Sequence, residues 1–84
     1  MQLRTTDLTW QIAGDEVVVL DLGGSVYLKL NGSGRVLWEA LAEPATEAEL
    51  AAALVDRFGI DDQRAADDVA AFVGELRRRE LIDG

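Results

Sequence analysis

The chain has 84 residues, no cysteine and no histidine, and its sixteen acidic residues against eight basic ones give a net charge of −8. This acidity disfavours contact with a phosphate backbone, so we expect no nucleic-acid partner. Without thiols or imidazoles, the chain lacks the commonest nucleophile, general base and metal ligands, so we expect a protein that is no enzyme and has no catalytic residues, metal site or cofactor.

Length and apolar content limit the architecture. A chain of this size that is 49% hydrophobic suffices for one small folded domain, which we place at residues 1–84. No apolar run reaches the roughly 18 residues required to span a bilayer, and the N-terminus lacks the apolar core of a signal peptide. We therefore expect a cytoplasmic protein with no membrane partner.

The N-terminal half has the composition of β-structure. Two segments rich in Val, Leu and Tyr are separated by Gly23-Gly24, a pair suited to the positive φ angles of a tight hairpin turn. A shorter β-like segment precedes them, with Ala13-Gly14-Asp15 as its turn. We expect three strands, at residues 8–12, 16–22 and 25–31.

The predicted hairpin pairs Leu20 with Tyr27 on one face and Val19 with Leu28 on the other. Both faces are largely apolar, whereas a three-stranded sheet normally buries only one. Leu20, Leu22 and Tyr27 are therefore expected to form an exposed apolar patch, unless helices or the chain ends cover it.

The C-terminal half is predicted to be helical. Ser33 can cap a first helix, Thr46 and Glu49 have the spacing of a capping box for a second, and Asp61 or Asp62 begins a third. A glycine ends the second helix and a proline follows the first. We expect helices at residues 33–42, 46–59 and about 61–79.

The third helix carries a broad apolar stripe that fills an arc of about 120°. Asp68 borders the stripe, and the apolar pair Leu81-Ile82 beyond the helix is expected to fold back onto the core. Two explanations of the stripe remain open. Either the whole stripe packs in the core, or one margin packs on the other helices and the other margin binds a guest molecule. The stripe consists of Ala65, Ala66, Val69, Phe72, Val73 and Leu76.

Three strands followed by three helices imply an α+β domain, with the helices gathered on one face of an antiparallel sheet. A winged helix-turn-helix has this order of elements. In such a sheet the third strand is an edge, whose unpaired amide and carbonyl groups can bind an extended peptide.

The remaining charged and glycine-rich motifs have structural explanations. Asp61-Asp62 and Asp67-Asp68 lack the calcium-loop pattern and suit the N-terminal half of a helix. Arg77-Arg78-Arg79 lies in a last helical turn, where cations complement the helix dipole. Gly32-Ser33-Gly34 lacks the lysine of a P-loop, which leaves turn formation as its function.

The spacing of several clusters resembles the PqqD-like family, the RiPP recognition elements that bind leader peptides of ribosomally made, post-translationally modified peptides. The similarity extends from about Glu16 to Ile82 and is closest to the discrete recognition proteins of lasso-peptide biosynthesis clusters. The residues that carry it are Tyr27, Leu30, Asn31, Gly34, Trp38 and Leu41, then Thr46, Glu49, Leu50, Leu54 and Phe58, then Asp68, Val69, Phe72, Val73 and Leu76, and finally Leu81 and Ile82.

This resemblance implies a winged helix-turn-helix that does not bind DNA. The leader would add as an antiparallel strand beside the third strand and lie against the third helix, with Asp68 orienting or attracting it. The peptide-binding residues carried over are Val26, Tyr27, Leu28, Lys29, Leu30, Asp68, Val69, Phe72, Val73 and Leu76.

The partners that the resemblance implies are the leader of a precursor peptide, a leader peptidase and a macrolactam-forming cyclase. One alternative is a PqqD-like peptide chaperone for a radical enzyme in cofactor biosynthesis. The other is a winged-helix DNA-binding regulator, whose recognition helices would be expected to be basic.

Overall fold

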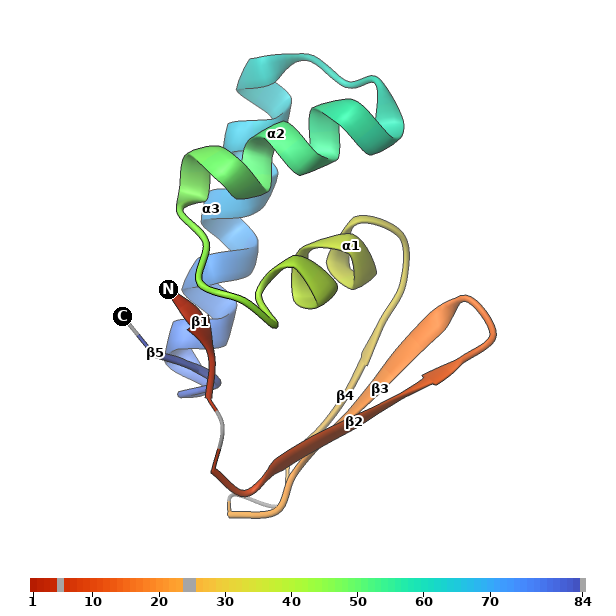
Figure 1. Cartoon of the computed structure of the whole chain (residues 1–84), viewed down its shortest axis with the longest axis vertical. Coiled ribbons are helices and arrows are strands. Elements are labelled where there is room, and N and C mark those ends of the chain that lie inside the picture. Colours follow the sequence, from red (N-terminus) through yellow and green to blue (C-terminus); the bar gives the residue numbers. More distant parts are fainter. Residues whose placement is uncertain (5, 24–25, 84) are drawn as a thin grey trace.

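The computed structural model describes residues 1–4, 6–23 and 26–83, apart from the side chain of Val26. A three-stranded antiparallel sheet followed by three helices confirms the predicted α+β winged helix-turn-helix (Figure 1). In chain order the elements are β1 (Gln2–Leu3), β2 (Leu8–Ala13), β3 (Glu16–Asp21), β4 (Val26–Leu30), α1 (Gly32–Ala40), α2 (Glu47–Phe58), α3 (Asp62–Arg78) and β5 (Ile82–Asp83).

The sheet has the order β2-β3-β4 and the predicted register. Leu20 pairs with Tyr27 and Val19 with Leu28, as the alternation of the hairpin requires. At the other turn, Gly14 has a φ of 64°, a conformation that glycine adopts without strain. Gly24, in the second predicted turn, and Ser25, the first residue of the predicted third strand, lie outside the described residues.

Two of the three predicted helix caps are confirmed. The Thr46 hydroxyl accepts from the Glu49 amide at 3.1 Å, and the Glu49 carboxylate accepts from the Thr46 amide at 3.0 Å. Asp61 accepts from the Arg64 amide at 2.7 Å. The prediction that Ser33 caps α1 is wrong, because the N-cap is Asn31, which makes no side-chain cap bond, and the amides of Gly34 and Arg35 donate to its backbone carbonyl.

A short antiparallel pair, β1 with β5, joins the two ends of the described chain beside the base of α3 (Figure 1). Sequence reasoning missed it because two-residue strands show no alternation. Leu81 of the predicted apolar tail is fully buried next to β5, as expected. The Arg4 amide donates to the Leu81 carbonyl at 2.8 Å, which continues the connection beyond the pair.

Arg4 also ties this terminal pair to the main sheet. Its Nη2 atom lies 2.5 Å from Oδ1 of Asp21, a residue only 6% exposed at the end of β3. Its Nη1 atom donates to the Glu80 carbonyl at 2.9 Å. One guanidinium therefore connects the sheet with the turn that follows α3.

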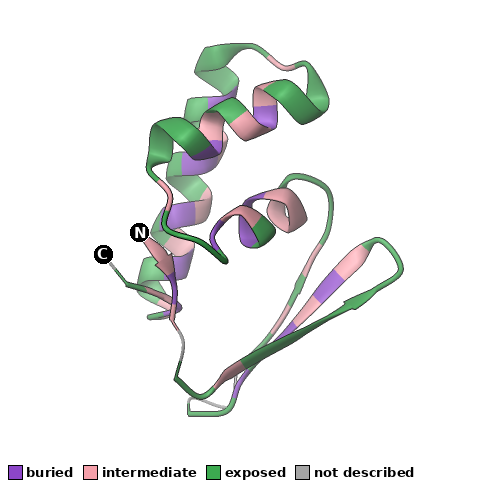
Figure 2. Ribbon diagram, viewed as in Figure 1, coloured by how far each residue is buried: buried purple, intermediate pink, exposed green. Residues whose placement is uncertain are grey.

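The core lies where the three helices meet the inner face of β3 (Figure 2). Trp38 of α1 is fully buried, and Trp10 of β2 packs edge-on against it with ring centroids 5.6 Å apart. The other buried apolar residues are Leu3, Val17, Val19, Leu37, Leu41, Leu50, Leu54, Ala65, Val69, Val73, Leu76 and Leu81.

We predict that Arg4→Met lowers the free energy of unfolding by about 2 kcal/mol, because the shielded Asp21 carboxylate loses its cation. Urea denaturation followed by circular dichroism measures the change. Arg78→Met is the matched control, since Arg78 is 76% exposed and pairs only across the surface with Glu75. Equal effects of the two variants would contradict a structural role for Arg4.

Candidate functional site

The outer edge of β4 is open. β4 is the last strand of the β2-β3-β4 sheet, and β3 is its only strand neighbour among the residues that the structure describes. Apart from its pairing with β3, β4 makes no backbone hydrogen bond to another segment within those residues. An edge strand directs alternate amide and carbonyl groups away from its partner, so β4 offers a template for one further strand.

The side chains of β4 divide between the two faces of the sheet. Leu28 and Leu30 are half-buried and pack against the core. Tyr27 is 57% exposed on the opposite face, where Lys29 lies 3.9 Å from the Glu16 carboxylate. Of the predicted site residues in this strand, Leu28 and Leu30 therefore face the helices, whereas Tyr27 and Lys29 do not.

Gly34 brings the end of β4 close to α3. A Cβ atom placed on Gly34 would lie 3.3 Å from Cδ2 of Leu30 and 3.7 Å from Cε1 of Phe72. The absence of a side chain in the first turn of α1 thus leaves room for both residues to approach it. Leu30 and Phe72, distant in sequence, are brought to one place, and both are partly exposed.

The apolar stripe of α3 is split between core and surface. Val69, Val73 and Leu76 are each only 1% exposed and belong to the core. Phe72 is half-buried at the margin of the stripe, and Ala66 is exposed. In this structure, the predicted contact residues Val69, Val73 and Leu76 form the floor beneath the margin, and Phe72 is the large apolar side chain that a guest can touch directly.

Asp68 lies one turn before Phe72, at a shallow hollow of about 230 Å³. Its carboxylate is 3.9 Å from Nε of Arg64, an exposed ion pair on the surface of α3. The hollow is lined by Ser33, Phe58, Ile60, Arg64 and Asp68.

Sequence reasoning did not point to Ile60 or Arg64, which line this hollow, and it assigned Phe58 to the apolar period of the second helix and to the family pattern. Ile60 lies in the short loop between α2 and α3, where no helical periodicity marks its direction. The only local signal is that Phe58 and Ile60 flank the glycine that ends α2.

The charges near the helices do not suit nucleic acid. The first turn of α2 contains Glu47 and Glu49, and Arg79 of the basic run pairs with Glu75 at 2.6 Å. Arg78 pairs with the same glutamate. A DNA-binding winged helix needs a cluster of exposed cations on these helices, and one unpaired arginine in an acidic α2 does not supply it, so the charges disfavour a regulator although the fold permits one.

Within the described ranges, no group of three or more His, Cys, Asp or Glu side chains could hold a metal ion. No helix in the same ranges is long and apolar enough to cross a membrane.

An open sheet edge beside a helix with a partly exposed aromatic residue is a geometry to which an extended peptide can add. The sequence model of the family described as "Coenzyme PQQ synthesis protein D (PqqD)" matches residues 16–82. The chain belongs to the PqqD family, which confirms the resemblance in the sequence. A search of curated proteins finds no match.

Two solved structures are similar over nearly the whole chain. The first, described as "TbiB1 in Complex with the TbiA(beta) Leader Peptide", is 26% identical with a TM-score of 0.90, covering 100% of this chain and 96% of that one. The second, "Lasso peptide synthetase B1 complexed with the leader peptide", is 22% identical with a TM-score of 0.81, covering 95% and 93%. The second likeness concerns the fold alone.

We predict that alternate amides of residues 27–30 exchange with solvent rapidly in the free protein, because those that point away from β3 have no acceptor. The amides of β3, which lies between two strands, should exchange much more slowly. Native-state hydrogen exchange followed by NMR measures both sets. Uniform protection along β4 would mean that the edge is covered.

Proposed function

We propose that this protein is a non-catalytic binding module that captures the leader of a ribosomally made precursor peptide in lasso-peptide biosynthesis. The observation that carries the proposal is the open edge of β4, located beside Phe72 of α3. The likeness to a TbiB1 structure with a leader peptide supports it.

In this proposal, the leader adds to β4 as an antiparallel strand. The backbone from Val26 to Leu30 supplies hydrogen bonds that tolerate many sequences, because every peptide has the same main-chain groups. Side-chain selection falls to Leu28 and Leu30, together with Phe72 on α3. The buried Val69, Val73 and Leu76 hold Phe72 and the sheet in place from below.

Asp68 contributes electrostatic selection at the same groove. The chain carries a net charge of −8, and Asp68 lies at the hollow next to Ser33. A lysine or arginine in the leader would gain both long-range attraction and a nearby carboxylate.

The size of the groove limits the affinity. One added strand and a few side-chain contacts bury an area at or below the low end of about 1,200 Å² for specific interfaces. Dissociation constants between about a micromolar and a nanomolar are reasonable for such an interface. That range suits capture followed by transfer to an enzyme.

The bound leader would be presented to separate cytoplasmic enzymes, a leader peptidase and then a macrolactam-forming cyclase. The protein contributes a raised local concentration and a fixed orientation, and makes no bond itself. A strand antiparallel to β4 begins opposite Leu30 and ends opposite Val26, so the segment that follows the leader leaves the sheet at the Val26 end.

Near that end lies an exposed apolar patch, defined by Leu20, Leu22 and Tyr27. These side chains are 42%, 66% and 57% exposed, as the sequence predicted. Leu20 and Tyr27 are cross-strand partners on the sheet face opposite the core. We propose this patch as the docking face for the peptidase, because the scissile region emerges beside it.

The alternative client is a peptide that a radical enzyme modifies in cofactor biosynthesis. It would bind the same groove of the same fold. Family membership does not separate the two clients. The likeness to a TbiB1 structure with a leader peptide supports a leader as the client, and the likeness in fold to a lasso peptide synthetase B1 favours a lasso-type leader. Parallel titrations with the two classes of precursor distinguish them.

We predict that Leu28→Lys and Phe72→Ala each weaken leader binding about tenfold or more, because each removes apolar contact from the groove. Isothermal titration calorimetry with the synthetic leader of the precursor encoded beside this chain measures the change. Circular dichroism establishes that each variant is folded.

Ile12→Lys is the matched control, since it places the same charge on the opposite edge strand at a residue 58% exposed. Binding should be unchanged in this control. Wild-type affinity in both Leu28→Lys and Phe72→Ala would place the leader elsewhere on the molecule.

We further predict that Leu20→Asp leaves leader affinity unchanged but slows leader cleavage by the peptidase about tenfold or more, because a charge in an apolar interface is poorly solvated. Cleavage of the precursor followed by mass spectrometry measures the rate. Gln11→Asp is the control, because Gln11 is exposed on the same face of the other edge strand and pairs with Val18, outside the patch. A normal cleavage rate in Leu20→Asp would exclude the patch as the docking face.

A further inference from the structure

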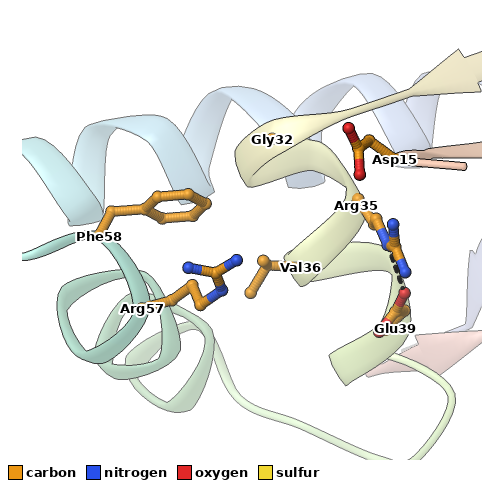
Figure 3. Close-up of a pocket in the computed structure, with 7 residues that line it drawn as sticks. All are labelled: Asp15, Gly32, Arg35, Val36, Glu39, Arg57 and Phe58. Carbon is orange, nitrogen blue, oxygen red and sulfur yellow. Dashed lines mark hydrogen bonds and ion pairs between the residues drawn. The ribbon is translucent and has the colours of Figure 1, made fainter.

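A second and larger hollow of about 570 Å³ lies between α1 and the end of α2 (Figure 3). Gly32, Arg35, Val36 and Glu39 line it from α1, and Arg57 and Phe58 from α2. Asp15, from the turn between β2 and β3, completes the lining beside Arg35 (Figure 3). Two apolar side chains, two carboxylates and two guanidinium groups therefore line one concave surface.

The two arginines of this hollow differ in their partners. Nε of Arg35 donates to the Glu39 carboxylate at 2.8 Å, and its Nη1 donates to the Gly14 carbonyl at 3.0 Å. Arg35 thereby joins α1 to the turn of the β2–β3 hairpin. Its binding capacity is largely used within the protein.

Arg57 has no such partner. Its guanidinium carbon lies 5.4 Å from the ring centroid of Phe58, and no carboxylate among the described residues is within ion-pair distance of it. In Figure 3 its guanidinium points into the space between Phe58 and Val36. An unpaired guanidinium beside two apolar groups suits a carboxylate on a short apolar stem, such as an aspartate or glutamate side chain.

The larger hollow and the smaller one near the end of β4 share one lining residue. Phe58 lines both this hollow and the smaller one at Ser33 and Asp68. Ser33 precedes Gly34, the residue next to which Leu30 and Phe72 meet. A chain leaving the groove past Leu30 thus crosses the smaller hollow and reaches Arg57.

Strand direction decides which part of a peptide takes this path. β4 runs from Val26 to Leu30 and then into α1, so the N-terminal flank of an antiparallel guest lies at the Leu30 end. The residues of the leader upstream of the added strand are therefore the ones directed toward Arg57.

We propose that the Arg57–Phe58 hollow is a second subsite for the leader, which pairs Arg57 with an acidic residue upstream of the segment added to β4. This inference rests on the proposed function. It gives the leader a charge pattern, with the acidic residue at the Arg57 end and basic residues favoured near Asp68. The net charge of −8 disfavours an acidic peptide in general, so an unpaired guanidinium is a specific point of attraction for a leader carboxylate.

The test compares Arg57→Ala with wild type, using the synthetic full-length leader of the precursor encoded beside this chain. Calorimetry at low salt should show binding weakened about three- to fivefold, the range of a partly exposed ion pair. The loss should disappear at about 1 M salt, where the Debye length falls to about 3 Å. Arg57→Lys should retain part of the affinity, because lysine keeps the positive charge but cannot donate the two parallel hydrogen bonds that a planar guanidinium gives a carboxylate.

Two controls separate this subsite from general electrostatics. Arg78→Ala removes the same unit of charge from an exposed site near the other end of α3, and should leave leader affinity unchanged. A leader whose upstream acidic residues are replaced by asparagine or glutamine should bind wild type and Arg57→Ala equally. Arg57→Glu should be rescued when the same leader positions carry lysine.

The outcomes distinguish the two levels of the proposal. If wild type does not bind the full leader, the proposed function fails. If wild type binds the leader and Arg57→Ala binds it equally well at low salt, the proposal of a second subsite is wrong, and the proposal of leader binding at β4 is unaffected. A leader with no acidic residue upstream of the added segment would also overturn the subsite.

Discussion

Unpaired main-chain groups along β4 are the constraint on which the site depends. A sheet with the order β2-β3-β4 has two edges, and β4 is the one whose end meets α3. Its outward amides and carbonyls are left to water, since no other described segment pairs with them. Under the proposed function, these groups would bind the main chain of peptides of many sequences, and the neighbouring helix would select their side chains.

The helix beside that edge performs two tasks with one stripe. Val69, Val73 and Leu76 are buried against the other helices and keep α3 fixed. Phe72, at the margin of the same stripe, stays partly exposed where Leu30 approaches Gly34. A rigid helix that holds one aromatic side chain at a sheet edge loses little entropy when a peptide binds.

Two charged side chains near the groove, Arg57 and Asp68, can orient a bound peptide. The chain has a net charge of −8, yet Arg57 has no ion-pair partner among the described residues and lies beside the exposed ring of Phe58. Arg57 lines the larger hollow and Asp68 the smaller one, and Phe58 lines both. A peptide that follows the groove meets carboxylate and guanidinium groups in a fixed order, and this order can set the polarity of binding without catalytic chemistry.

The sequence by itself determined the elements, the hairpin register and the caps at Thr46 and Asp61, because these depend on neighbours close in the chain. Strand alternation placed Leu20 and Tyr27 on one face of the sheet, but it left open whether helices or the chain ends cover that face, and the structure shows Leu20, Leu22 and Tyr27 exposed. Only the tertiary structure decided that α1 is capped by backbone at Asn31, that β1 pairs with β5, and which part of the α3 stripe stays accessible. Those outcomes depend on contacts between distant segments, and periodicity does not encode which side of a broad apolar stripe another helix will cover.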